Sequence, residues 1–225
     1  MILVVGGANA SIVIHGTRVI YNGDKKEATI SITNKNKTPV LIQSWVDSGG
    51  GNSQVNEKDI PFIITPPINR VNPDNGQTLR IRYTGNPKLP SDKESVFWLN
   101  VLEIPAKTEG VSSQQNVLSL AFRSKIKIFY RPQGLSGEAA SAADNLKWSM
   151  ESNGIRVTNP TQYHVSIVNV FANKKSGSAH DIPGRMIAPG ETQFYDLKTN
   201  NIGLDEVGFS TINDYGALMQ HKIRK

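Results

Sequence analysis

Cysteine is absent from this chain of 225 residues. Its absence excludes disulfide bonds, thiol catalysis and metal sites with cysteine ligands. It does not place the protein in the reducing cytosol, because a chain of this length can bury enough apolar surface to fold without disulfides. A secreted protein therefore remains compatible with the composition.

Long apolar runs are absent too, and no stretch approaches the ~20 residues needed to cross a bilayer. The short apolar run Ile2–Val5 is followed by small residues that end in Ala8-Asn9-Ala10, which is typical of the end of a secretory signal. The positive region that opens such signals is missing. An ordinary first strand is the alternative, but residues 11–21 already supply one. We expect residues 1–10 to be a residual signal tail and the mature chain to begin at Ser11.

The sequence also lacks the motifs that would indicate an enzyme. It has no G-x-S-x-G, G-x-G-x-x-G or P-loop pattern. Its histidines lie in unrelated segments, without the spacing of zinc ligands on a helix. They are His15, His164, His180 and His221. Asp92 and Glu94 could pair on one strand face, but an ion-paired or solvated strand start explains them better. We therefore expect no enzymatic activity, no metal and no cofactor.

Acidic residues are fewer than basic ones, which gives a net charge of +6. A partner such as nucleic acid is one explanation, and a modest excess of solvated lysine is the other. Nucleic-acid binding needs basic residues interleaved with aromatic ones, and residues 123–131 come nearest to that pattern. The opposite face of this segment is apolar, so packing explains its aromatic residues better. We expect no nucleic-acid partner, whose binding would fall steeply with salt, and no membrane insertion.

The sequence does contain many short segments in which apolar and polar residues alternate, as they do in β-strands. Seven of them occupy the first half of the chain, separated by turn-forming stretches such as NGDKK and NPDNG. They span 11–21, 27–34, 38–47, 61–73, 77–83, 95–105 and 116–132. Seven short strands are expected of one immunoglobulin-like sandwich.

A stretch rich in Gly, Ala and Ser follows at residues 132–145 and indicates a linker with irregular or briefly helical structure. From Leu146 onward the strand patterns resume, which predicts a second, smaller sandwich. The sequence therefore predicts an all-β protein with an N-terminal immunoglobulin-like domain over 11–131 and a C-terminal one over 132–225.

One segment, residues 117–132, has two different faces. Leu118, Leu120 and Phe122 alternate along one face, and basic residues follow on the other from Arg123. Inward-facing residues of the protein's own sandwich are one interpretation. The other is an edge strand that pairs with another chain, because long exposed apolar edges are otherwise an aggregation hazard.

Eight motifs are spread along nearly the whole chain after Ala10. They are GTRVIY (16–21), ISITNKNKTPVLIQSWVD (30–47), PFIITPPINRVNP (61–73), LPSDKESVFWLNVLEIP (89–105), SKIKIFYRP (124–132), VTNPTQYHV (157–165), IAPGE (187–191) and INDYGA (212–217). Together they resemble the periplasmic chaperones of the chaperone–usher pathway, the PapD-like family. The short connection 106–115 resembles the short-loop branch of that family.

This resemblance implies a fold of two immunoglobulin-like sandwiches, joined at an angle with a cleft between them. It also implies a periplasmic chaperone that stabilises pilus subunits by donor-strand complementation and delivers them to an outer-membrane usher. Arg18 and Lys127 match the pair that holds the C-terminal carboxylate of a subunit. Leu118, Leu120 and Phe122 match the residues that fill the groove of a subunit lacking its last strand.

Other matches concern the fold. Glu94, Arg131 and Asp214 match an interdomain ion-pair network that holds the angle between the sandwiches. Positions expected to serve turns or the core, with no binding role, are Asn34, Pro66, Pro67, Asn159, Pro160 and Gly190.

A structural or adhesive β-sandwich protein of the bacterial cell surface is the alternative. Such a subunit should carry its own N-terminal extension of alternating apolar residues and lack a full second sandwich, and the sequence shows neither sign clearly. The sequence leaves open which subunits are bound, which surface contacts the usher, and whether free molecules self-associate.

Overall fold

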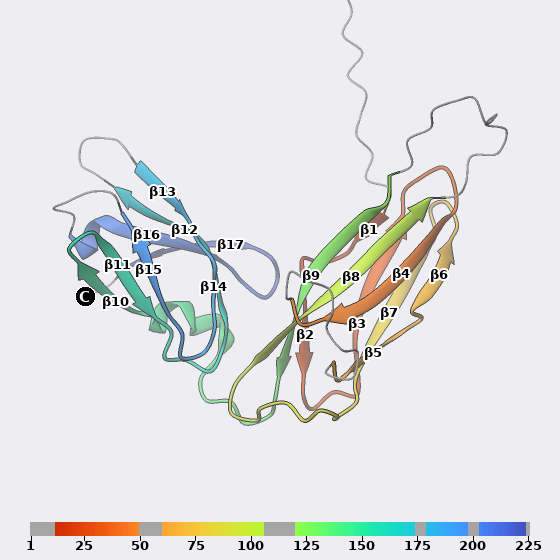
Figure 1. The fold of residues 1–225 in the computed structure, drawn as a ribbon, viewed down its shortest axis with the longest axis horizontal. Helices are drawn as coiled ribbons and strands as arrows, with labels where there is room; N and C mark the ends of the chain where they lie inside the picture. Colours follow the sequence, from red (N-terminus) through yellow and green to blue (C-terminus); the bar gives the residue numbers. More distant parts are fainter. Residues whose placement is uncertain (1–11, 50–59, 106–119, 174–178, 198–202, 224–225) are drawn as a thin grey trace, which may run out of the picture. The chain divides into compact units, whose positions relative to one another are not determined.

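The computed structural model describes residues 12–49, 60–105, 120–173, 179–197 and 203–223. Contacts divide the chain into two compact units (Figure 1). The first contains Lys25–Leu89 and Val96–Phe129, together with the chain up to Tyr21. The second contains Asn22–Asp24, Pro90–Ser95 and the chain from Tyr130 onward. In the described ranges, no helix has the length and apolar composition that a membrane span requires.

Two sheets form the first unit. One has the order β1 (Ile12–Ile14), β3 (Ala28–Asn34), β7 (Gly76–Tyr83), β5 (Phe62–Thr65). The other has the order β2 (Arg18–Asn22), β9 (Phe122–Arg131), β8 (Ser95–Pro105), β4 (Val40–Asp47), β6 (Ile68–Val71).

Aromatic rings join these two sheets across the interior. Phe62 of β5 meets Tyr21 of β2 and Phe97 of β8 edge to face, with ring centroids 5.8 and 4.9 Å apart. Within the first sheet, Ile30 lies opposite Leu79, and both side chains are buried. Such close contacts between inward-facing residues of two sheets define a sandwich core.

Two segments that were each expected to form one strand, 11–21 and 61–73, form two strands each in the structure. The predicted extents of these strands were therefore wrong. In segment 11–21 the backbone turns at Gly16, whose N–H bonds to the carbonyl of Ile14 at 2.9 Å. As a result β1 pairs with β3, while β2 joins the other sheet. Segment 61–73 breaks at Pro66-Pro67, because proline has no N–H to donate to a strand ladder.

The second unit also has two sheets. One has the order β10 (Lys147–Glu151), β11 (Gly154–Thr158), β15 (Thr192–Asp196). The other has the order β13 (Ala179–Pro183), β12 (Val165–Asn173), β16 (Val207–Ile212), β17 (Leu218–Lys222), with β14 (Met186–Ile187) beside β12. Trp148 and Phe209 connect the sheets, with ring centroids 4.8 Å apart. Three 3-10 turns, η2 (Ala139–Ser141), η3 (Ala143–Asn145) and η4 (Leu204–Glu206), complete the described part. The predicted fold class, all-β with two immunoglobulin-like sandwiches, is confirmed.

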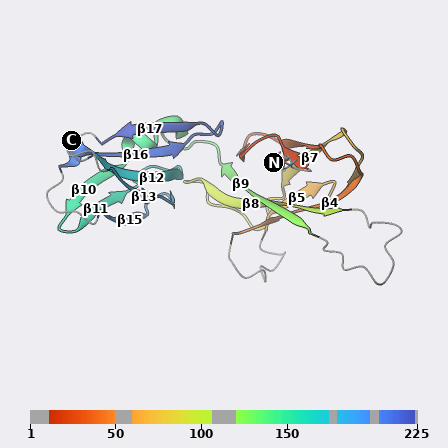
Figure 2. The same cartoon turned by 90° about the horizontal axis from the view of Figure 1, so that it is seen from above.

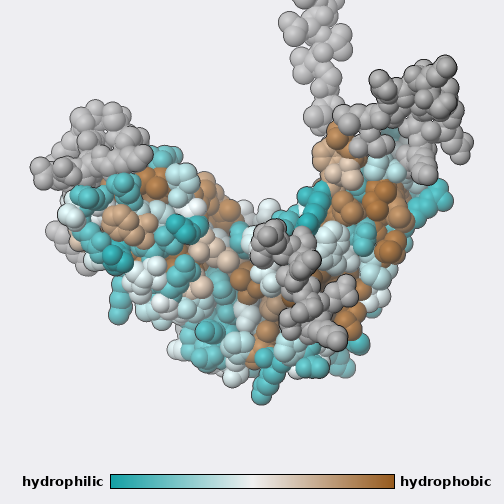
Figure 3. All heavy atoms as spheres, viewed as in Figure 1, coloured by the Kyte–Doolittle hydropathy of each residue, from teal (hydrophilic) through white to brown (hydrophobic). Residues whose placement is uncertain are grey.

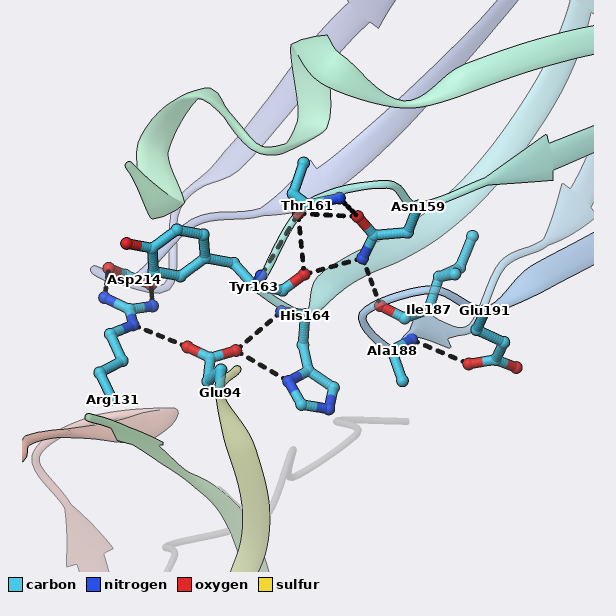
Figure 4. Close-up of polar contacts among 10 residues, drawn as sticks. All are labelled: Glu94, Arg131, Asn159, Thr161, Tyr163, His164, Ile187, Ala188, Glu191 and Asp214. Atoms are coloured by element: carbon cyan, nitrogen blue, oxygen red, sulfur yellow. Dashed lines mark hydrogen bonds and ion pairs between the residues drawn. The ribbon is translucent and has the colours of Figure 1, made fainter. Parts of the chain in front are cut away.

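A buried asparagine closes a loop in each unit. The side-chain amide of Asn34 donates to the carbonyls of Thr38 and Val71, both at 2.9 Å. In the second unit Asn159 donates to the carbonyls of Tyr163 and Ile187, at 2.7 and 3.1 Å (Figure 4). Both asparagine side chains are fully buried.

Replacing Asn34 with alanine should therefore remove the side-chain donor from the buried carbonyl of Val71 and from the part-buried carbonyl of Thr38. We expect Asn34→Ala to lower the free energy of unfolding of the first unit by about 2–4 kcal/mol, which urea denaturation would measure. The matched change Asn75→Ala, at an exposed position of the same unit, should cost less than about 0.5 kcal/mol. Equal effects of the two changes would contradict this role for Asn34.

Candidate functional site

Strand β9 lies between β2 and β8 in the larger sheet of the first unit. Figures 1 and 2 both show β9 running beside β8. Its even-numbered residues are buried toward its end, where Ile126 is half-buried and Ile128 is fully buried. At its start the same face is open: Phe122 is 63% exposed, and Leu120, just before the strand, is 56% exposed. Figure 3 shows apolar surface at the end of the unit where β9 begins. The third expected residue, Leu118, lies outside the described residues.

This exposure follows from the unequal lengths of neighbouring strands. β9 has ten residues and β2 has only five. The N–H of Gly23, just after β2, bonds to the carbonyl of Arg131, the last residue of β9, at 2.6 Å. β2 therefore runs beside the second half of β9. In the described part of the chain, the first half of β9 has a neighbouring strand, β8, on one side only.

The odd-numbered residues of β9 lie on the other face and form cross-strand rows with β8 and β4. In the first row Trp45 and Asn100 are direct partners. Arg123 donates to Oδ1 of Asn100 through Nε at 2.9 Å and through Nη2 at 2.6 Å. Its guanidinium also lies 4.9 Å from the centroid of the Trp45 ring, within cation–π range.

The second row contains Asp47, Trp98 and Lys125. Asp47 and Trp98 are partners in the register of β4 and β8. The Lys125 ammonium lies 3.0 Å from Oδ1 of Asp47 and 5.2 Å from the centroid of the Trp98 ring. Gly49, at φ +90°, runs so close to this ring that a side chain there would collide with it. The backbone at Gly49 thus covers the Trp98 ring of this row.

Asp47 connects the two rows. Besides the Lys125 contact, its carboxylate accepts hydrogen bonds from Arg123 Nη2 at 3.1 Å, Asn100 Nδ2 at 2.9 Å and the Gly49 N–H at 2.8 Å. Burial alone would raise the pKa of Asp47, but the bonds from Lys125, Asn100 and Gly49 outweigh it and lower that pKa.

The two cations expected to bind a carboxylate, Arg18 on β2 and Lys127 on β9, are close enough to influence one another. Burial, and then the charge of Arg18, lower the pKa of Lys127 below that of an ordinary lysine. The Lys127 ammonium lies 4.9 Å from the centroid of the Trp98 ring, and the Arg18 guanidinium lies 5.8 Å from that of Phe129. Both side chains are half-buried. An anion between them would relieve their repulsion.

Glu94, Arg131 and Asp214 also come together, and all three belong to the second unit (Figure 4). Arg131 donates through Nε to Glu94 at 2.6 Å and through both terminal nitrogens to Asp214 at 2.6 and 2.8 Å. Burial alone would lower the pKa of Arg131. The hydrogen bonds and charges of Asp214 and Glu94 outweigh burial, so the pKa of the guanidinium is raised. His164 joins the cluster, because its N–H donates to Oε2 of Glu94 at 2.8 Å and its ring Nδ1 lies 2.9 Å from the same oxygen.

Sequence reasoning missed Asp47, Asn100 and His164. The first two were visible only as members of SWVD and FWLN, where each lies two residues from a tryptophan, Trp45 or Trp98, on the same strand face. Their contact with β9 depends on the register of three strands, which alternation alone does not give. No signal in the sequence pointed to the contact of His164 with Glu94.

The arrangement in the first unit is suited to binding rather than to chemistry. It offers an open strand edge with apolar residues on one face and, farther along, two half-buried cations. Such a strand can pair with an extended partner chain, and the cations can hold an anion. Among the described residues, no three His, Asp or Glu side chains are grouped as a metal site would need.

Comparison with known proteins bears on both units. Residues 11–136 match the family described as pili and flagellar-assembly chaperone, PapD N-terminal domain. Residues 141–223 match the family described as pili assembly chaperone PapD, C-terminal domain. The two matches together cover nearly the whole chain.

Individual relatives align over similar lengths. The chain is 41% identical over 224 residues to the probable fimbrial chaperone YadV of Escherichia coli K12, covering 96% of this chain and 90% of that protein. It is 41% identical over 219 residues to the chaperone protein FimB/FhaD of Bordetella pertussis, covering 96% and 88%.

Solved structures agree with these matches. The crystal structure of the YadV chaperone aligns with a TM-score of 0.78 and 39% identity, covering 96% of this chain and 100% of that one. A chain in the structure of the Salmonella enterica SafA pilin in complex with the SafB chaperone aligns with a TM-score of 0.78 and 25% identity, covering 97% and 99%.

The lowered pKa of Lys127 leads to a prediction about stability. The pKa of Lys127 is lower in the folded state than in the unfolded state. The charged ammonium therefore destabilises the fold when the pH is below the folded-state pKa. This penalty falls as the pH rises and disappears above the pKa of a lysine in the unfolded chain. Lys127→Met should therefore raise the Tm at pH 7, by about 1–3 °C, and should have no such effect above about pH 10.5.

Lys125→Met is the matched control, because that ammonium pairs with Asp47. This change should lower the Tm at pH 7. Thermal unfolding of both variants measures the difference, and a drop in Tm for Lys127→Met as large as that for Lys125→Met would contradict the assignment.

Proposed function

This chain belongs to the PapD family of pilus-assembly chaperones, and on that premise we propose that it captures pilus subunits in the bacterial periplasm by lending them strand β9. The subunit would lack its last strand, and β9 would complete its sandwich until an outer-membrane usher accepts it. The family consists of chaperones rather than enzymes, and the proposed function needs no catalysis and no cofactor.

The observation that carries this proposal is the exposure of Phe122, at the start of a strand whose later residues are buried, and of Leu120 just before that strand. An open apolar edge is hazardous for a monomer unless it is a binding device. Burying these two side chains in a subunit would contribute roughly 3–6 kcal/mol, against several kcal/mol lost on association. Leu118 is proposed as the third residue of the same row. The same edge could mediate self-association of free molecules.

A carboxylate anchor would fix the register of this pairing. We assign that role to Arg18 and Lys127, which could each donate a charge-assisted hydrogen bond worth about 1.5–3 kcal/mol to the C-terminus of a subunit. Register matters because a slip of one residue would turn the apolar row to the wrong face. The mutual repulsion of the two cations in the free protein favours such an anion.

Two further observations favour this function over its alternatives. The solved structure of the SafA pilin in complex with the SafB chaperone contains a chain that is similar to this one. Nucleic-acid binding would need free basic side chains, whereas Arg123 and Lys125 are engaged with Asp47. The expected interdomain role of Glu94, Arg131 and Asp214, and membership of the short-loop branch, remain predictions; the connection 106–115 lies outside the described residues.

The anchor is tested by Lys127→Ala and Arg18→Ala. Each should reduce subunit capture about 10–150-fold, because a partly buried carboxylate would lose one of its two cations. The measurement is recovery of a pilus subunit with the tagged chaperone from periplasm. Lys35→Ala, at an exposed pair with Asp74, is the control and should capture normally. Stoichiometric capture by either anchor variant would show the anchor assignment to be wrong.

The apolar row is tested by Leu120→Glu. A charge in the subunit's groove should weaken capture about 10–100-fold, because the carboxylate would have to be desolvated there. The Tm of the free chaperone should change by less than about 2 °C, since Leu120 is exposed. A large loss of Tm would instead show that Leu120 belongs to the protein's own core.

A further inference from the structure

We propose that Asp47 and Asn100 are positioning residues that hold the exposed half of β9 extended, and in register with β8, before a subunit arrives. This inference rests on the proposed function of β9 as a donated strand. It adds that the strand is prepared for donation by side chains on the opposite face of the sheet.

The exposed half of β9 needs such support. Beside Phe122–Ile126, the described chain provides only β8 as a neighbouring strand, because β2 covers the later residues. Its even-numbered side chains contribute little packing there, since Phe122 and Ser124 are both exposed. A segment with one neighbouring strand and few buried contacts opens readily by local unfolding.

Side chains on the other face replace the missing contacts. Arg123 and Lys125 flank the exposed Ser124, and both contact Asp47, at 3.1 and 3.0 Å. Asp47 belongs to β4, which is separated from β9 by β8, so these contacts cross the width of three strands. Asn100 of β8 lies between them, accepting from Arg123 and donating to Asp47. The side chain of Asp47 is only 15% exposed, which limits screening by solvent and salt.

Fixing the odd-numbered residues also fixes the even-numbered ones. Successive side chains of a strand point to opposite faces, so clamping Arg123 and Lys125 to β8 and β4 keeps Phe122 and Ser124 on the open face. A partner then meets a strand that is already extended. A pre-formed binding element loses less conformational freedom on association. Because a larger fraction of the free molecules is then competent to bind, we expect a higher association rate with the subunit.

The test compares Asp47→Asn with the conservative variant Asp47→Glu and with Asp74→Asn as control. Asp74 makes an exposed ion pair with Lys35 in the same unit, and its positive φ of 57° suits asparagine. Hydrogen exchange of the free proteins is measured first. In Asp47→Asn the amides of 122–126 should exchange at least about 10-fold faster, with the Tm changed by less than about 3 °C. Asp47→Glu should restore slow exchange, and Asp74→Asn should not alter it.

Capture kinetics form the second arm, with the subunit that co-purifies with the wild-type protein from periplasm as the probe. Asp47→Asn should lower the association rate about 5–10-fold and change the dissociation rate less than about 2-fold, because the bound strand is held by the subunit itself. Unchanged exchange at 122–126, or faster exchange with an unchanged association rate, would overturn the proposal. Failure of the proposed function appears differently: the wild-type protein would then capture no subunit, or Lys127→Ala would capture as well as the wild type.

Discussion

Strand β9 supplies Ile128 to the interior of the first unit and leaves Phe122, earlier on the same face, in solvent. The short neighbour β2 covers the later residues of β9, and the described part of the chain provides no second neighbour for the earlier ones. One continuous strand thus serves two cores: the protein's own and, in the proposed function, that of a subunit. The rest of the site follows from how this open half is kept extended and how its register is set.

Charge performs both of these tasks on the face away from the apolar row. Arg123 and Lys125 both pair with Asp47, whereas the charge of Lys127 is disfavoured by burial and then by the charge of Arg18. Residues of the same type on one strand face therefore have opposite energetic roles, according to their neighbours. A cation pair retained in spite of its repulsion is typical of a binding site, because functional sites are where stability is given up for recognition.

Alternation of apolar and polar residues predicted the fold class and most strand positions, because a half-buried strand imposes that pattern. It failed at Gly16 and at Pro66, where the chain changes sheet inside an apolar stretch and alternation continues on both sides. The alternation pattern predicted the row of Leu120 and Phe122 as apolar but left its exposure as one of two interpretations, since burial depends on the length of β2. The network of Asp47 and Asn100 needed the register of three strands, which no single strand encodes.

The absence of cysteine from the chain permits a direct test of the central claim, that the open face of β9 enters the subunit. Ser124→Cys places a single thiol on that face between Phe122 and Ile126, and Ser31→Cys places one at an exposed position of β3 as a matched control. The rate of maleimide labelling is measured for each, free and with a captured subunit. The account predicts that capture slows labelling at position 124 at least about 10-fold and leaves position 31 unchanged, because only the donated face is shielded from solvent. Equal labelling of position 124 in the free and the subunit-bound protein would contradict it.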